Sequence, residues 1–263
     1  MVGLAWYFNI TPKNNRDWQD DVAFNVDYQQ QNNQITVYNV RNFNWRTEHD
    51  YDIRWETRHY DLNQLQGVDL VLSTWGIDQI SHTLLTFRFN DGQKLAFSIE
   101  TRKEKSEDFS MINGFFRKYE LAFIASDEKD VIYTRTNIRT DETTYIYPLQ
   151  LSPEITRQLF LTYLQRGQQL NQQPQWYNSL TSNCTTVIYD MVKHITPVPS
   201  DSRILASGLL PEYLYQHHVL DNQYSLNEWK NKTLIDPKVE NFKTLDDQSS
   251  QHYSQIIRQG LDK

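Results

Sequence analysis

The stretch of this 263-residue chain that most constrains its fold is a hairpin sequence at residues 82–100. Apolar and polar residues alternate on both sides of Asn90-Asp91-Gly92, which is typical of two antiparallel strands joined by a tight turn. A two-residue Asp-Gly turn pairs residues whose numbers sum to 183. A three-residue loop with Gly92 in the left-handed position pairs residues that sum to 182. The choice matters because a slip of one residue moves every side chain to the other face.

The three-residue loop gives the cleaner separation of apolar from polar side chains. It gathers six apolar residues on one face, namely Leu85, Phe87, Phe89, Leu95, Phe97 and Ile99. We therefore predict this register, which places His82 directly opposite Glu100. A carboxylate that orients an imidazole is the arrangement that thiol catalysis requires. The alternative is an ion pair at the surface, which contributes little to stability.

Cys184 is the only cysteine of the chain, and it lies where a polar loop meets an amphipathic run. Apolar residues follow it at helical spacing, namely Val187, Ile188, Met191, Val192 and Ile195. With Ser182 or Asn183 as the N-cap, Cys184 falls in the first helical turn. Unpaired N–H groups and the helix dipole favour a thiolate there, which suits a nucleophile. The alternative is a buried cysteine that acts as a small hydrophobe.

Composition excludes several kinds of site and partner. A single cysteine excludes an intramolecular disulfide and a multi-cysteine metal site, and the adjacent His217 and His218 would point apart on a helix. No metal or other cofactor is expected, because there is no Gly-rich phosphate loop or metalloprotease motif. The net charge is -7 without a basic run, so nucleic acid is not an expected partner.

The start of the chain, Met1 to Phe8, is apolar but much shorter than the roughly 20 residues that span a bilayer. It also lacks the layout of a signal peptide. It is either the end of a removed membrane segment or a first strand. We expect the chain as given to be soluble, without an anchoring segment.

The patterns along the chain predict a single α+β domain over residues 1–263. Residues 1–150 are expected to be mainly strands, including the His82/Glu100 hairpin and further strands over 22–28, 35–40, 68–74, 118–126, 131–138 and 143–149. Residues 151–195 are expected to hold two helices, one beginning at Ser152-Pro153 and one at Cys184. Residues 196–263 are predicted to form a helical or irregular extension, with helices over 209–219 and 251–261 and an irregular stretch over 221–247.

A set of motifs resembles the Lnb-type periplasmic domain family. The motifs are Arg41-Asn42-Phe43, Tyr60-Asp61-Leu62, Val68-Asp69-Leu70, Ser81-His82-Thr83, Ser98-Ile99-Glu100-Thr101-Arg102, Gly114-Phe115-Phe116-Arg117, Tyr119-Glu120-Leu121 and the stretch 177–186. The order of a strand His, an acid on the next strand and a Cys at a helix start is similar to the circularly permuted papain-like (NlpC-type) fold. That resemblance implies an antiparallel sheet packed against the helix that carries the Cys, with a helical C-terminal extension.

The family is associated with N-acylation of bacterial lipoproteins. The resemblance therefore implies that Cys184 is the nucleophile, His82 the general base and Glu100 the acid that orients it. Asn183 is expected to help the backbone N–H groups of the helix start to hold the oxyanion. From its place in the sequence, Arg102 is a candidate to hold Glu100 or a substrate acid; the alternative is that it only balances neighbouring acids. The implied partners are a phospholipid acyl donor, the lipid-modified N-terminal peptide of a lipoprotein and a membrane surface. The implied location is the periplasm, at the membrane.

Two other functions stay open from the sequence. With water as the acceptor, the same residues would serve a cysteine amidase, a peptidase or a lipid hydrolase. With a merely buried Cys184, the chain would be a non-catalytic domain that binds lipid or lipoprotein. An enzyme acting on lipids needs an apolar entrance, for which the candidates are Trp75, Phe115, Phe116, Trp176 and Tyr177; the alternative for each is a place in the core. The acyl donor, the chain length and the oligomeric state are left open.

Overall fold

A computed structural model describes residues 9–108, 113–243 and 248–261, so the expectation for Met1 to Phe8 lies outside the described residues. The strands are β1 Asp27–Gln31, β2 Gln34–Arg41, β3 Asn44–Thr47, β4 Asp50–Asp52, β5 Trp55–Asp61, β6 Leu65–Trp75, β7 Ser81–Phe89, β8 Lys94–Arg102, β9 Glu120–Ser126 and β10 Glu142–Pro148. The α-helices are α2 Glu128–Val131, α3 Pro153–Gln172, α4 Cys184–Ile195, α5 Leu210–Gln216, α6 Leu226–Thr233, α7 Asp236–Val239 and α8 Gln248–Ile256. Short helical turns are η1 Asp20–Val22, η2 Leu62–Gln64, η3 Asn113–Phe115, the π-helical η4 Thr134–Ile138, η5 Ser202–Ile204 and η6 Ser207–Leu209.

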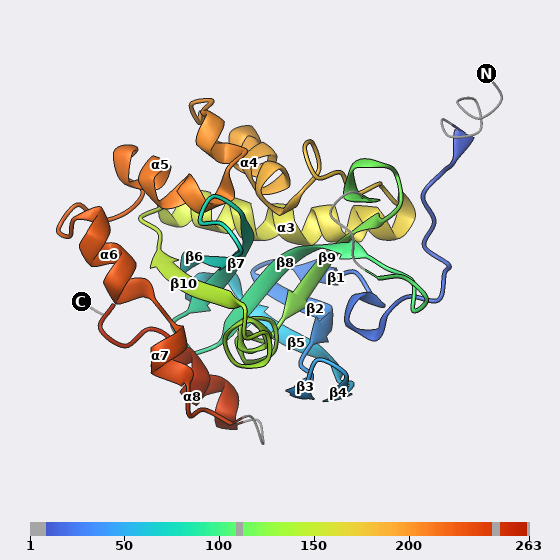
Figure 1. Cartoon of the computed structure of the whole chain (residues 1–263), viewed down its shortest axis with the longest axis horizontal. Coiled ribbons are helices and arrows are strands. Elements are labelled where there is room, and N and C mark those ends of the chain that lie inside the picture. The colour runs from blue at the N-terminus through green and yellow to red at the C-terminus, as the bar shows by residue number, and fades with distance from the viewer. Residues whose placement is uncertain (1–8, 109–112, 244–247, 262–263) are drawn as a thin grey trace.

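The fold is α+β, built on a mixed eight-stranded sheet (Figure 1). The strands follow the order β1-β2-β9-β8-β7-β6-β10, and β5 pairs with β2. The prediction of an antiparallel sheet is wrong in one pairing, because β2 and β9 run parallel at Val40↔Ala125 and Arg41↔Ser126. Parallel neighbours need a long connection, and here the whole segment from β3 to β8 lies between β2 and β9 in the chain.

The register predicted for the central hairpin is confirmed. β7 and β8 pair from Leu84↔Ser98 to Arg88↔Lys94, so the paired numbers sum to 182. Gly92 closes the three-residue loop with a φ of 91°, a conformation that glycine adopts without a steric penalty. The six apolar residues predicted to share a face all lie in one core cluster.

Both faces of the sheet are covered by helices (Figure 1). On one face α3 and α4 pack on a core rich in aromatic rings, where Phe160 lies against Phe87 and Phe97 at centroid distances of 5.1 and 6.0 Å. The start of α3 agrees with the sequence, since Ser152 caps it and Pro153 begins it. On the other face a second core contains residues of α2, α7 and α8. The sheet therefore separates two cores.

The strand predicted over 131–138 is wrong: the chain forms α2 and then the π-helical turn η4. Asp127 caps α2 by accepting from the Lys129 backbone N–H, so the polar residues taken as a turn begin a helix instead. The stretch 221–247 also contains α6 and α7, and the Ser225–Glu228 capping box was the missed signal for α6. The strand expected over 22–28 begins only at Asp27.

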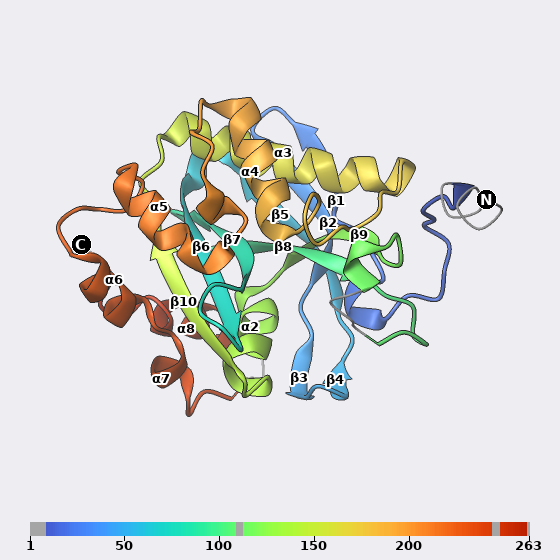
Figure 2. The same ribbon diagram turned by 45° about the horizontal axis from the view of Figure 1, so that its top comes forward.

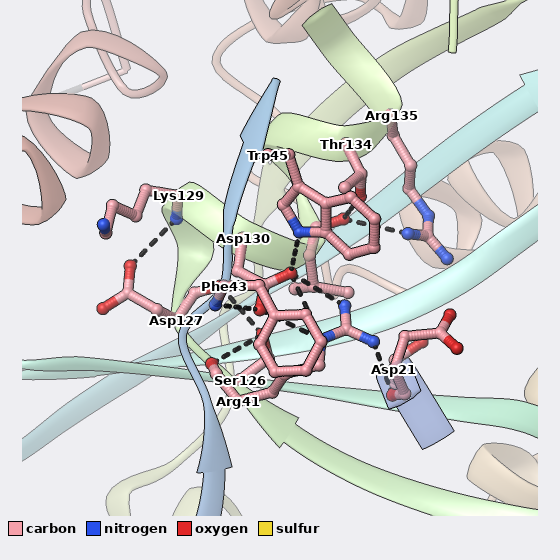
Figure 3. A network of polar contacts seen from close by, with 12 residues as sticks. Asp21, Arg41, Phe43, Trp45, Ser126, Asp127, Lys129, Asp130, Thr134 and Arg135 are labelled. Atoms are coloured by element: carbon pink, nitrogen blue, oxygen red, sulfur yellow. Dashed lines mark hydrogen bonds and ion pairs between the residues drawn. The ribbon is translucent and has the colours of Figure 1, made fainter. Parts of the chain in front are cut away.

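A buried carboxylate, Asp130, holds α2 against the strand end at Arg41 (Figure 3). Its Oδ1 accepts from Arg41 Nη2 at 2.9 Å and from Trp45 Nε1 at 2.8 Å. Its Oδ2 accepts from Arg41 Nε at 3.0 Å and from the Phe43 backbone N–H at 2.8 Å. Four donors around one buried acid satisfy both oxygens, which offsets the cost of taking the charge out of water.

We predict that Asp130→Ala lowers the free energy of unfolding by roughly 3–5 kcal/mol, because it leaves the Arg41 charge buried without a partner. Denaturant unfolding measures the change. The matched control is Asp50→Ala, which breaks an Asp–Arg pair with Arg46 at the surface and should change stability little. Equal effects of the two substitutions would contradict this account of the buried pair.

Candidate active site

The first turn of α4 meets β7 at the point where β7 and β8 stop pairing. The last pair of the β7–β8 ladder is Leu84↔Ser98, although β7 continues to Ser81 beside β6. Here the hydroxyl groups of Thr83 and Thr185 lie 2.8 Å apart and bond β7 to α4. Cys184, the first residue of α4, lies within hydrogen-bonding reach of His82 on β7.

Asn183 is the N-cap of α4, as one of the two sequence candidates proposed. Its Oδ1 accepts from the backbone N–H groups of Thr185 and Thr186 at 3.0 and 2.8 Å. Its Nδ2 donates to the Ser179 carbonyl at 2.7 Å. These contacts hold the Asn183 side chain in its capping position, and its expected contribution to an oxyanion site stays a prediction. Within the described ranges, no residue accepts a hydrogen bond from the Cys184 backbone N–H.

His82 and Glu100 are joined both directly and through a serine. His82 Nε2 lies 3.3 Å from Glu100 Oε1. It lies closer, at 2.7 Å, to Ser98 Oγ, and Ser98 Oγ donates to the same Glu100 oxygen at 2.5 Å. All three side chains are largely withdrawn from solvent. The predicted proximity of His82 and Glu100 is thus present, with Ser98 inserted between them.

The cation at Glu100 is Arg135, which sequence reasoning did not identify. Arg135 Nη2 donates to Glu100 Oε1 at 3.0 Å, and Nη1 donates to the Val131 carbonyl at 2.9 Å. The expectation that Arg102 holds Glu100 is wrong. Arg102 instead donates to the backbone carbonyls of Val22 and Ala23 and stacks on Trp18, and so ties the N-terminal segment to β8.

Electrostatics at the site favour an ion pair between imidazolium and thiolate. Burial lowers the pKa of His82, but the charge of Glu100, helped by Cys184, outweighs burial and raises that pKa to about 9. Burial raises the pKa of Cys184, but the charge of His82 and a hydrogen bond to it bring the pKa below its ordinary value. Burial also raises the pKa of Glu100, yet His82 and Arg135 hold it well below its ordinary value. Glu100 is therefore an anion, and the proton of the Cys184–His82 pair is favoured on the imidazole.

The charge of Cys184 affects the pKa values of two tyrosines, Tyr163 and Tyr177. Burial, together with the charge of Cys184, raises the pKa of Tyr163 and Tyr177, so both hydroxyl groups stay protonated at neutral pH. Tyr163 is fully buried on α3, and its hydroxyl has no hydrogen-bond partner in the part of the chain that the structure describes. Neither of these two tyrosines therefore competes with Cys184 for the negative charge.

Exposed apolar side chains lie on the loops before β7 and α4 and on the segments next to them, and we call this set the apolar rim. Eight large apolar side chains are exposed in the described part of the chain, and six of them belong to the rim: Ile77, Ile80, Phe115, Phe116, Leu180 and Leu205. Of the residues expected to form an apolar entrance, Phe115 and Phe116 lie at the surface, whereas Trp75, Trp176 and Tyr177 are half-buried.

Hydrogen bonds join the segments of the apolar rim in two separate pairs, and Figure 2 shows the members of each pair side by side. The loop before β7 bonds to the segment before α5 through Gly208 N–H and the Gln79 carbonyl at 3.2 Å. In the same place Ser207 Oγ donates to the Ser81 carbonyl at 2.6 Å. The loop before α4 bonds to η3 through Ser179 N–H and the Gly114 carbonyl at 3.0 Å. The first pair therefore adjoins Ser81, which precedes His82, and the second pair includes the loop that leads to Cys184.

Comparison with known proteins identifies the family. The Lnb N-terminal periplasmic domain family matches residues 51–208, which is more than half of the chain and includes His82, Glu100 and Cys184. The chain belongs to this family. The match supports a periplasmic location. No curated protein and no solved structure matches the chain.

No helix within residues 9–108, 113–243 and 248–261 is long and apolar enough to cross a bilayer. Over the same ranges, no three His, Cys, Asp or Glu side chains are grouped as metal ligands.

We predict that Cys184 reacts with iodoacetamide below the pH at which an ordinary thiol ionises, because the charged His82 stabilises the thiolate. The rate should fall only at pH values below the lowered thiol pKa. His82→Gln should move this acid limb to higher pH, and the rate at pH 7 should drop about tenfold for each pKa unit that the thiol regains. Because Cys184 is the only cysteine, mass spectrometry reports the rate without interference. An acid limb that His82→Gln leaves in place would refute the ion pair.

Proposed function

We propose that this protein is a cysteine-dependent acyltransferase. It moves an acyl chain from a phospholipid, through a thioester on Cys184, to the N-terminal amine of a bacterial lipoprotein. The observation that carries the proposal is the contact of half-buried His82 on β7 with buried Cys184 at the start of α4, with the anionic Glu100 behind the imidazole. The order of His on β7, acid on β8 and Cys at a helix start also supports a permuted papain-like fold.

In the first half-reaction the Cys184 thiolate attacks the carbonyl carbon of a phospholipid ester. The carbonyl oxygen becomes an oxyanion, and the backbone N–H of Cys184 is the first-turn donor left for it. The C–O bond of the ester then breaks, and the His82 imidazolium gives its proton to the leaving lysophospholipid oxygen. The products are an acyl thioester on Cys184, a neutral imidazole and a lysophospholipid.

In the second half-reaction the amine of the lipoprotein attacks the thioester carbonyl. The neutral His82 takes a proton from the amine, the C–S bond breaks and an amide forms. The thiolate and the imidazolium are then restored together. Glu100 stays ionised throughout, because Arg135 and Ser98 both donate to its Oε1.

The apolar rim supports a lipid substrate and contact with a membrane surface. Exposed apolar patches rimmed by polar residues mark sites that bind lipids or other macromolecules. Here the patch flanks both loops that lead to the nucleophile and its base, so an acyl chain leaving a bilayer would meet apolar side chains before it reaches Cys184. Membrane contact at the rim is therefore part of the proposal.

Two other functions use the same observations differently. A thiol hydrolase would replace the amine by water, and a lipid-binding domain would leave Cys184 unreactive. Products formed with and without an amine acceptor separate transfer from hydrolysis. Alkylation of Cys184 with the pH dependence of an ordinary thiol would favour the binding domain.

We predict that incubation with phospholipid vesicles adds one acyl chain to Cys184, and that a diacylated lipopeptide then removes it and becomes triacylated. Mass spectrometry of the protein and the peptide follows both steps. Cys184→Ala should abolish both. Cys184→Ser is the matched control, because it keeps a small hydroxyl nucleophile that the site does not ionise. Triacylated product from Cys184→Ala would show that the thioester route is wrong.

We further predict that charges on the apolar rim impair acylation by vesicles and spare the chemistry. The double variant Phe116→Asp/Leu180→Asp should bind vesicles more weakly and acylate Cys184 more slowly, because burying a carboxylate in lipid is unfavourable. Its alkylation by iodoacetamide should match that of the wild type. Ile53→Asp is the control, since Ile53 is equally exposed near β4, away from α4 (Figure 1). Equal acylation of both variants would remove the rim from the proposal.

A further inference from the structure

We propose that Ser98 is a positioning residue that fixes which ring nitrogen of His82 acts as the base. It accepts the Nε2 proton, so that Nδ1 faces Cys184 and the incoming amine. The catalytic meaning of this inference rests on the proposed function, whereas the arrangement of protons can be tested in the resting protein.

The number of protons available determines the direction of each hydrogen bond. Ser98 Oγ lies 2.5 Å from Glu100 Oε1, so one proton must lie between these oxygens. Glu100 is ionised and has none to give. Ser98 therefore donates its only hydroxyl proton to Glu100 and must accept from its other neighbour, His82 Nε2, at 2.7 Å. His82 Nε2 thus carries a proton whether the ring is neutral or charged.

The short contact between Ser98 and Glu100 excludes the opposite direction of the Ser98 hydroxyl, and Arg135 does not change this. If Ser98 turned its proton toward His82 Nε2, two oxygens at 2.5 Å would face each other without a proton between them. Arg135 Nη2 donates to Glu100 Oε1 at 3.0 Å, but it cannot replace a proton on the line between Ser98 and Glu100. The charged groups that act on His82 are Glu100 from β8, Arg135 from η4 and Cys184 from α4. Nε2 is occupied by Ser98 and Glu100, so Nδ1 is the ring nitrogen that remains for Cys184.

This assignment matters most in the second half-reaction. The neutral imidazole must then accept a proton from the amine, and only an unprotonated Nδ1 on the side of Cys184 can do so. The opposite tautomer presents an N–H to the amine and has no lone pair there, so it cannot act as a base. Glu100 alone would hold the proton on Nε2 less firmly, because its Oε1 lies 3.3 Å from Nε2. The short contact to Ser98 is what holds the proton on Nε2.

The test is ¹⁵N NMR of the histidine rings during a pH titration through the His82 pKa of about 9. His82→Gln identifies the His82 resonances. In the wild type, Nε2 should stay protonated throughout and Nδ1 should lose its proton. Ser98→Ala should give a mixture of both tautomers at high pH and slow the alkylation of Cys184 at pH 7 about tenfold, as expected on losing a supporting hydrogen bond.

Two further variants separate positioning from a general loss of stability. Ser98→Thr keeps the hydroxyl and should restore the wild-type tautomer. Ser126→Ala removes an equally buried serine hydroxyl from the same sheet, one that bonds to backbone carbonyls away from His82, and should behave as the wild type. Loss of the Nε2 proton in the wild-type titration, or an unchanged tautomer and alkylation rate in Ser98→Ala, would overturn the inference. Neither readout uses a lipid, so failure here is distinct from failure of acyl transfer.

Discussion

The arrangement of the candidate site depends on one negative charge held inside the protein, that of Glu100. Its Oε1 accepts from Ser98 and Arg135 and lies 3.3 Å from His82 Nε2. A buried carboxylate is unfavourable unless charge and hydrogen bonds compensate for lost water, and these three groups provide both. Because Glu100 stays ionised, His82 stays charged, and because His82 is charged, the pKa of Cys184 is lowered.

The charge at Glu100 depends in turn on a second buried acid. Arg135 comes from η4, which directly follows α2, and Asp130 fixes α2 to the segment after β2 through Arg41, Phe43 and Trp45 (Figure 3). Cys184 comes from the opposite side of the sheet, on α4. The site thus forms where elements from the two cores meet, at the end of the β7–β8 ladder.

The sequence predicted the parts of this site that follow local rules. Hairpin register followed from the separation of apolar and polar residues, and the start of α4 followed from Asn183 and the spacing of apolar residues after it. Arg135 was missed because Val131 to Ile138 looks like a strand when its polar residues are assumed to face water; in the structure Thr134 and Arg135 are buried. Arg102 was chosen because it is near Glu100 in sequence, yet on β8 its side chain serves the N-terminal segment. Ser98 could have been found, since its side chain shares the face of Glu100 two residues away.

A transferase differs from a hydrolase in keeping water from the thioester until the amine arrives. The proposed acyl transfer would need this kind of protection. Cys184 is only 8% exposed, and the exposed apolar side chains of the rim include residues of the loops that precede β7 and α4. Contact of the rim with lipid would cover that approach further, so that water would be excluded most strongly when the acyl donor is present. A lipoprotein amine, held at the membrane by its own acyl chains, would then reach the thioester from the same surface. In the proposed reaction the apolar rim would receive the lipid substrates, and the charged His82 would activate the Cys184 thiol.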